Sequence, residues 1–335
     1  MIEKLRFLII TDHRQHRPAN PVYSLTSELF SRPETKLIDI VSRGNPKNDP
    51  FFTEQSTHFY TTRIGPDFSF QPSGDQFIQN QNDGNIEDYD VVLMRLARPV
   101  DSSFLHFVAH HTQNKVVINH PLGIEKTSSK AFLLNFPDLC PPIKLCHKIE
   151  DILSFMEQFP IVLKPLKEYG GKGILRAEGG IIYDQDQSYS AQEYLQKQKD
   201  YIENQGYLAM KFMKNVSQGD KRIIVAGGEI LAASLRKPAE GSWLCNVSQG
   251  GSSESALPEA EEVEMINRIS PTLLKEGILI YGADTLVNDD GKRILSEINT
   301  LSVGGFADIQ ANTGIPIIPK TIDKILAYVN PKYNN

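Results

Sequence analysis

Hydrophobic and polar positions in the first third of the chain predict strands and helices in turn. Apolar runs such as "RFLIITD", "LIDIVS", "DVVLMRL" and "KVVINH" are separated by the amphipathic segments "VYSLTSELFS" and "SSFLHFVAHHTQ". Strands that alternate with helices predict βαβ units and a mostly parallel sheet. We therefore expect residues 1–120 to form a Rossmann-like α/β domain. The polar stretch 45–88 interrupts the pattern and predicts a long loop or an irregular insertion.

A new unit starts after residue 120, and from residue 160 onwards paired strands and tight turns predict an α+β region. "EKTSSKAFLLNF" predicts a helix capped by Thr127. Further on, "KRIIVAGGEILAASLRK" is expected to turn at Gly227-Gly228, and "GADTLVNDDGKRILSEIN" at Asp290-Gly291. Between these hairpins, "PEAEEVEMINRISPTLLKEG" predicts a long amphipathic helix that ends at Gly277, with acidic residues near the positive end of its dipole.

The last hairpin brings polar side chains together. A two-residue turn at Asp290-Gly291 places Asp284 opposite Glu297 and, on the same face, Gly282 opposite Asn299. Like charges that lie directly opposite destabilise a sheet, so this pair favours a compensating cation. Carboxylate and amide oxygens are hard donors that suit Mg²⁺, which completes its shell with water and phosphate. The pattern predicts a metal site, with a solvated hairpin face that carries incidental acids as the alternative.

The segment "LKPLKEYGGKGILR" carries a glycine-rich loop between two apolar runs. It matches neither the P-loop nor the dinucleotide-binding fingerprint. Gly170, Gly171 and Gly173 nevertheless allow positive φ angles, so their N–H groups can form an anion-binding nest beside Lys164 and Lys172. A flexible structural loop is the alternative. Taken with a metal site, the loop favours a phosphate-binding role of the kind that ATP-dependent enzymes use.

Composition narrows the classes of function. A length of 335 residues allows two or three domains, and a net charge of −6 argues against a surface dedicated to nucleic acid. No apolar run approaches the ~20 residues of a membrane span. "FLII" near the start is too short for a signal-peptide core. The three cysteines are an odd number and fit free thiols in a reducing compartment, so we expect a cytoplasmic protein with small-molecule partners.

Ordered motifs spread over most of the chain resemble those of the ATP-grasp superfamily and, within it, the prokaryotic glutathione synthetases. "DVVLMRLARP" is similar to that family's "DVILMRKDPP", and "IVLKPLKEYGG" to its "IILKPLDGMGG". "GDKRIIVAGGEIL" is similar to "GDKRVLVVDGEPV", and "LSEINTLS" to "LTEINVTS". The resemblance implies a Rossmann-like N-terminal domain and a two-lobed ATP-grasp domain. Its implied parts are a substrate-binding domain 1–120, a small lobe 121–208 with the glycine-rich loop, and a large lobe 209–335 with the metal site.

The resemblance also implies a role for each matching residue. The implied ATP-binding residues are Lys130, Lys164, Gly170, Gly171, Gly173, Met210, Lys211, Phe212 and Met213. The implied Mg²⁺ ligands, with Mn²⁺ as the alternative ion, are the three that the hairpin selects: Asp284, Glu297 and Asn299. Arg222 and Arg236 are the implied catalytic residues. Simple alternation around Gly227-Gly228 puts these two arginines on opposite faces, so a bulge or a bend is needed to bring both to one site.

The implied reaction is the ATP-dependent joining of a carboxylate to an amine through an acylphosphate. γ-Glutamylcysteine and glycine are the implied acid and amine. Residues 237–251 match a mobile lid, which would exclude water from the acylphosphate. The family also implies a dimer or a tetramer. The alternatives are a ligase for another amino acid or peptide, as in the glutamate ligases, and an ATP-binding sensor without ligase activity.

The parts expected to face the substrate agree least with the family. "KEYGG" replaces "DGMGG", and "TLSVGGFADIQ" after Asn299 lacks the family's "IRE". The loop "TDHRQHRPANPVYSL" near the N-terminus does not reproduce its counterpart. In that loop Arg14, His16 and Arg17 either bind an anionic substrate or form a solvated basic surface.

Overall fold

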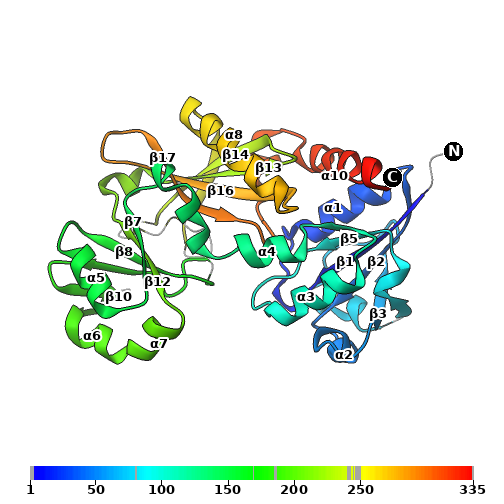
Figure 1. Ribbon diagram of the computed structural model, residues 1–335. Coiled ribbons are helices and arrows are strands. Elements are labelled where there is room, and N and C mark those ends of the chain that lie inside the picture. Colours follow the sequence, from blue (N-terminus) through cyan, green and yellow to red (C-terminus); the bar gives the residue numbers. More distant parts are fainter. Residues whose placement is uncertain are drawn as a thin grey trace.

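The computed structural model describes residues 4–333 apart from 80, 169, 185–186, 240–242, 244 and 246–249. Three sheets form in this part of the chain, and they follow one another along the sequence. In Figure 1 the N-terminal sheet and the second sheet lie apart, and the third sheet, with α8 (Ala260–Lys275), lies above both. The expected α/β class, with an α+β C-terminal part, is confirmed.

The N-terminal sheet has the strand order β4-β3-β2-β1-β5-β6. Its parallel strands are β1 (Leu5–Thr11), β2 (Thr35–Ser42), β5 (Val91–Met94) and β6 (Val116–Ile118). The helices α1 (Pro21–Phe30) and α3 (Ser102–His111) are the ones that the apolar periodicity predicts. Asn20 caps α1 by accepting a hydrogen bond from the Val22 N–H, and Pro21 supplies the fixed φ that suits a first helical position.

Residues 45–88 are not the long loop or irregular insertion that their composition predicts. They add the antiparallel strands β3 (His58–Arg63) and β4 (Asn82–Asn85) to the edge of the N-terminal sheet. The short helices of this stretch are η2 (Pro46–Asn48), α2 (Asp49–Phe52), η3 (Asp75–Phe77) and η4 (Ile86–Asp88). The prediction failed because apolar anchors are sparse here: Phe51, Phe59 and Phe77 are buried, but polar residues separate them.

The second sheet has the order β11-β10-β9-β8-β12-β7, and its paired strands are antiparallel. Its strands are β7 (Ile143–Cys146), β8 (Ile161–Pro165), β9 (Leu175–Glu178), β10 (Ile181–Asp184), β11 (Gln187–Ser190) and β12 (Tyr207–Lys211). The helices α5 (Ile149–Met156), α6 (Ala191–Lys197) and α7 (Lys199–Asn204) accompany it. Strand β12 runs across the expected boundary at residues 208 and 209, and the three domain ranges stay predictions.

The segment that joins the first two sheets corrects the predicted helix cap. Thr127 is the last residue of α4 (Pro121–Thr127), and its hydroxyl donates back to the Gly123 carbonyl. The cap is Ser129, whose side chain accepts from the Ala131 N–H at the start of the 3₁₀ helix η5 (Lys130–Asn135). A second 3₁₀ turn, η6 (Pro137–Leu139), leads into β7.

The third sheet has the order β15-β14-β13-β16-β17. Its strands are β13 (Asp220–Ala226), β14 (Glu229–Lys237), β15 (Ser252–Ala256), β16 (Ile280–Val287) and β17 (Arg293–Asn299). The predicted turn at Gly227-Gly228 and the end of α8 at Gly277 are confirmed. The remaining elements are η1 (His13–Gln15), η7 (Lys214–Gln218), α9 (Phe306–Thr313) and α10 (Ile317–Tyr333), and α10 lies beside α1 (Figure 1).

Two large apolar cores combine side chains of the N-terminal and third sheets. One contains Leu8 with Tyr281, and the other contains Phe7 with Ile280. A smaller core, formed by residues between Cys146 and Ala209, belongs to the second sheet alone. The first and third sheets are therefore one packed body, although some hundred residues separate their strands.

Asn119, which directly follows β6, joins these two sheets through a buried side-chain amide. Its Nδ2 donates to the carbonyls of Ile280 (2.6 Å) and Thr300 (2.7 Å). Its Oδ1 accepts from the N–H groups of Leu279 and Ile280, each at 2.9 Å. All the hydrogen-bonding capacity of this amide is used, so the end of β6 is fixed to the start of β16.

Candidate active site

The predicted pairing of the last hairpin is confirmed at the position that matters. Asp284 lies opposite Glu297 and Gly282 lies opposite Asn299. The Asn299 amide lies 3.3 Å from an Asp284 carboxylate oxygen. One face of β16 and β17 therefore carries two carboxylates and an amide side by side.

The predicted two-residue turn, by contrast, is wrong. The Asn288 N–H donates to the Lys292 carbonyl, which leaves a three-residue loop that ends at Gly291 with φ of 83°. The Asn288 side chain stabilises this loop by accepting from the N–H groups of Asp290 and Lys292. A bulge between Asp284 and Thr285 then shifts the register by one residue and restores the predicted pairs.

Ser296 is the extra residue of this bulge. Its hydroxyl donates to the Asp284 carbonyl at 3.1 Å, and its own carbonyl accepts from Lys164 Nζ at 3.0 Å. Lys164 lies on β8 of the second sheet and is only 8% exposed. Burial lowers the pKa of this lysine, and the nearby Glu297 carboxylate opposes that shift. The second and third sheets thus meet at the Ser296 carbonyl, which the bulge leaves free of the hydrogen bonds between strands.

A second bulge brings the two predicted arginines to the same face. The register of β13 and β14 shifts between Ile224 and Val225, so Arg222 pairs with Ser234 and Asp220 pairs with Arg236. This is the bulge that the sequence required if Arg222 and Arg236 were to share a site. Arg222 Nη2 lies 2.6 Å from Asp284 Oδ2, and Arg236 Nη2 lies 2.9 Å from the same oxygen. Arg236 also binds Asp220, at 2.6 and 2.7 Å.

These ion pairs determine the charge of the buried carboxylates. Burial works against ionisation of Asp284, which is 3% exposed, but the charges and hydrogen bonds of Arg222 and Arg236 outweigh it and hold its pKa well below the ordinary value. Burial raises the pKa of Asp220, although Arg236 opposes this effect. Asp284 is therefore an anion at neutral pH, with two guanidinium groups against it.

Two cavities meet at this cluster. The smaller, of about 70 Å³, is lined by Lys164, Asp284 and Glu297 together with the whole predicted adenine-binding segment Met210, Lys211, Phe212 and Met213. Trp243 lines it too and contacts the Phe212 ring edge-on, at 5.8 Å between centroids. Lys211 Nζ is held by Asp289 at 2.7 Å. Met210, Phe212 and Trp243 give this cavity an apolar wall beside the charged cluster, which suits a nucleotide base.

The larger cavity has a volume of about 600 Å³ and lies on the other side of Glu297. Lys130, Gly170, Arg222, Arg236 and Asn299 all line it. Lys130 Nζ donates to the Glu168 carbonyl and lies 3.4 Å from Glu297 Oε1. The glycine loop has the positive φ angles that the sequence suggested, 65° at Gly170, 79° at Gly171 and 65° at Gly173.

Other predicted site residues lie elsewhere or cannot be placed. Arg14, His16 and Arg17 are not among the residues that line the larger cavity. Arg14 binds Asp12 at 2.7 Å, and His16 bonds to Thr11 and Tyr23. Much of the expected lid 237–251 lies outside the described residues. Sequence reasoning missed Arg98 and Ser128, which line the larger cavity, because neither residue belongs to a catalytic pattern.

The family model for the ATP-grasp domain of prokaryotic glutathione synthetase matches residues 129–314, more than half of the chain. The chain belongs to this family. Glutathione synthetase from Bradyrhizobium diazoefficiens is 28% identical over 72% of this chain and 74% of its own length. That from Vibrio cholerae is 29% identical, over 76% of this chain and 78% of its own. Family membership makes the chain an ATP-dependent carbon–nitrogen ligase of the glutathione synthetase kind.

Solved ATP-grasp structures share the fold. A D-cycloserine synthetase superposes with a TM-score of 0.65 at 10% identity, and covers 96% of this chain and 99% of its own. A RimK-domain ATP-grasp protein from Sphaerobacter thermophilus gives a TM-score of 0.58 at 16% identity, over 95% and 99% of the two chains. At these identities the likeness concerns the architecture alone. No helix among the described residues is both long and apolar enough to cross a membrane.

Family membership implies a divalent cation, and the hairpin residues fit one. Among the described residues no three His, Cys, Asp or Glu side chains cluster as metal ligands. A cation at Asp284 and Glu297 would therefore take its other ligands from the Asn299 amide, from water or from phosphate. Oxygen donors completed by phosphate are the coordination that Mg²⁺ prefers. Glu297 and Asn299 thus suit a cation that arrives with a nucleotide, and Asp284 would join them by exchanging part of its contact with Arg222 and Arg236.

Proposed function

We propose that this chain joins γ-glutamylcysteine to glycine with consumption of ATP, and releases glutathione, ADP and phosphate. The observation that carries the proposal is the position of Glu297 and its neighbours between the two cavities. Met210 and Phe212 give the small cavity an apolar wall that suits adenine. Lys130, Arg222 and Arg236 give the wide cavity charged groups that suit an acid and an amine. Phosphoryl transfer from one cavity to the other would pass this cluster of charges.

In the proposed reaction the carboxylate of the acid becomes an acylphosphate, which the amine attacks with loss of phosphate. When bound, ATP and its cation supply the phosphoryl group and neutralise part of its charge. The residues of the chain bind and orient. Lys130 from η5 and Lys164 from the second sheet would balance phosphate charge. Arg222 and Arg236 would balance it from the third sheet.

The arginines can serve this role because they are already fixed. Each is held by a carboxylate at distances of 2.6–2.9 Å, so little reorganisation is needed when a further anion arrives. Asp284, Glu297 and Asn299 would hold Mg²⁺, with Mn²⁺ as the alternative ion, because both ions accept an oxygen-only ligand set. Residues 237–251 would close over the acylphosphate and exclude water.

A ligase for a different acid and amine is the second candidate. It is favoured by the sequence around the larger cavity, where "KEYGG" and "TLSVGGFADIQ" depart from the family's motifs. Gly170 and residues Leu301–Gly305 of these segments line that cavity. The nucleotide side would be unchanged in such an enzyme.

We propose further that the protein acts in the cytoplasm as a homo-oligomer with the domains 1–120, 121–208 and 209–335. Cys140, Cys146 and Cys245 are buried and unpaired, which fits a reducing compartment. Light scattering of the purified protein would distinguish a dimer or a tetramer from a monomer.

Substrate-dependent ADP release tests the proposed reaction. The protein is mixed with ATP, Mg²⁺ and a panel of acid and amine pairs that includes γ-glutamylcysteine with glycine. The proposal expects ADP release that requires both substrates, and a product with the mass of glutathione. Release with another pair alone would favour the second candidate, and no amine-dependent release from any pair would refute ligase activity.

A further inference from the structure

The loop that follows β5 lies where the N-terminal sheet can bind a ligand. Strand β1 has β2 on one side and β5 on the other, so the order in which strands are added to the sheet reverses between β1 and β5. Ligands of open parallel sheets bind beyond the carboxyl ends of the strands at such a point. Residues Ala97 to Pro99 follow β5 there, and Ala97 and Arg98 line the larger cavity of the active site.

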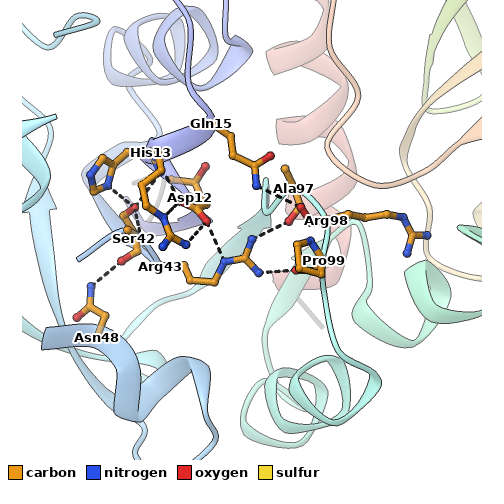
Figure 2. A network of polar contacts seen from close by, with 12 residues as sticks. Asp12, His13, Gln15, Ser42, Arg43, Asn48, Ala97, Arg98 and Pro99 are labelled. Carbon is orange, nitrogen blue, oxygen red and sulfur yellow. Dashed lines mark hydrogen bonds and ion pairs between the residues drawn. The ribbon is translucent and has the colours of Figure 1, made fainter. Parts of the chain in front are cut away.

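The backbone of this loop is held by side chains from two other loops. Arg43, which follows β2, donates to the Ala97 carbonyl at 3.0 Å and to the Pro99 carbonyl. Gln15 donates to the Arg98 carbonyl at 3.2 Å. Figure 2 shows these bonds converging on the loop from one side. Three successive carbonyls are thus bound, which fixes the direction in which Arg98 extends.

Arg43 is itself fixed by Asp12, the residue after β1. Asp12 is 2% exposed, and its Oδ2 accepts from Arg43 Nε at 2.9 Å. The chain of contacts therefore runs from a buried carboxylate through Arg43 to the backbone of Arg98. Figure 2 shows the Arg98 side chain extending away from this network. Its Nη2 reaches the carbonyl and the hydroxyl of Ser128, at 2.8 and 2.9 Å, on the cavity wall.

Arg98 is also a feature of this chain rather than of the motif it resembles. In the string "DVILMRKDPP" a proline stands where this chain has Arg98, and Lys-Asp stands where it has Leu96 and Ala97. At this position the chain thus carries a guanidinium that lines the cavity, where that string carries a proline. A planar guanidinium binds a carboxylate with two parallel hydrogen bonds, which a proline cannot do.

We propose that Arg98 is a specificity-determining residue that binds a second carboxylate of the acid substrate, one that does not react. The inference rests on the proposed function. The reacting carboxylate must meet the phosphoryl group near Asp284 and Glu297, whereas Arg98 comes from another sheet and another wall of the cavity. In γ-glutamylcysteine the second carboxylate is the α-carboxylate of the glutamyl residue. Arg43 and Asp12 are positioning residues that act through the loop.

The test compares γ-glutamylcysteine with 4-aminobutanoylcysteine, the analogue that lacks only the glutamyl α-carboxylate. Initial rates of ADP release are measured with glycine, ATP and Mg²⁺. Arg98→Gln should raise the KM for γ-glutamylcysteine by about 10- to 100-fold and change the KM for the analogue by less than about threefold. The KM for ATP should stay the same. Arg98→Lys keeps the charge but loses the paired geometry, and should fall between the two.

Arg43→Gln tests the positioning role. It should raise the KM for γ-glutamylcysteine in the natural protein. In the Arg98→Gln background the same substitution should raise that KM by less than about twofold, because the loop then carries no guanidinium for Arg43 to position. Arg268→Gln is the matched control. Arg268 is a half-exposed arginine of α8 that binds Asp138 and is not among the residues that line the larger cavity, so its loss should leave every constant unchanged.

The outcomes separate the two levels of the proposal. An active protein whose KM for γ-glutamylcysteine is insensitive to Arg98→Gln would overturn the role of Arg98 alone. So would an equal rise in KM for both acids. If no acid of the panel stimulates ADP release by the natural protein, the proposed function is overturned, and the role of Arg98 with it.

Discussion

The third sheet and the N-terminal sheet contribute to the active site in opposite ways. In the third sheet the charged residues lie on neighbouring strands, where Asp284 is bound directly by Arg222 and Arg236. The charged residues that act on the site from the N-terminal sheet lie on loops beyond the strands, where Asp12 holds Arg43 and Arg43 binds the backbone of another loop. The first arrangement fixes charges, and the second fixes the path of a loop. Substitutions should therefore affect chemistry and stability in the third sheet, and substrate preference in the N-terminal one.

Glu297→Gln should have the largest effect. It removes a negative charge at the junction of the two cavities but keeps the shape of the side chain, so kcat should fall by on the order of 10²–10³-fold with the melting temperature unchanged. Steady-state rates and a thermal melt check both expectations. Undiminished ligase activity would refute the metal-ligand assignment of Glu297.

Asp284→Ala should lower kcat by no more than Glu297→Gln does, but with a loss of stability that Glu297→Gln does not cause. It removes the carboxylate that pairs with both Arg222 and Arg236. The loss should lower the free energy of unfolding by about 3–5 kcal/mol. Urea unfolding of both variants measures the difference. Equal stability of the two proteins would contradict the description of Asp284 as the structural partner of both arginines.

Asn119→Ala should destabilise the junction of the two sheets without touching the site. Four backbone groups lose a partner inside the protein, and the expected cost is about 3 kcal/mol. The KM values, measured at a temperature where the variant is fully folded, should change little. If the free energy of unfolding falls by less than about 1 kcal/mol, water must satisfy these groups and the junction is weaker than described.

His16→Gln should have the smallest effect, and only in acid. Burial lowers the pKa of His16 to about 4, with the charges of His13 and Arg95 acting in the same direction and Asp12 opposing them. The unfolded chain takes up this proton near pH 6.5 and the folded chain does not, so the contribution of His16 to stability is lost as the pH falls from about 6.5 to 4. Glutamine does not titrate in this range. The free energy of unfolding, measured with urea, should therefore fall less between pH 7 and pH 5 in the variant than in the natural protein. An identical pH dependence in both proteins would contradict the shifted pKa.

The same contrast between the two sheets explains how much could be predicted from sequence. Hairpin pairing is local, so Asp284, Glu297 and Asn299 could be grouped from the spacing of a turn. The grouping was right although the turn was one residue too short, because the bulge at Ser296 compensates the error. The bulge leaves no trace in the pattern of apolar residues, because the extra buried residue is the polar Ser296.

The N-terminal contacts could not be predicted in this way. Arg43 and Ala97 are separated by more than 50 residues, and their contact depends on which strands are neighbours in the sheet. The polar composition of residues 45–88 predicts a long loop or an irregular insertion because it hides the strands β3 and β4. Arg98 was overlooked because an isolated arginine in a loop carries no recognisable motif.

The separate core of the second sheet has a consequence for motion. The N-terminal and third sheets share two cores and should move as one body. The second sheet, with Lys164 and the glycine loop, has a core of its own and reaches a shared core through side chains such as Leu208 and Met210 of β12. We expect nucleotide binding to rock the second sheet as a rigid lobe, and small-angle scattering with and without ATP should detect the compaction. Unchanged scattering would argue for a pre-closed molecule. Opening the lobe would break the hydrogen bond from Lys164 to the Ser296 carbonyl, so this buried lysine would hold the lobe in its closed position.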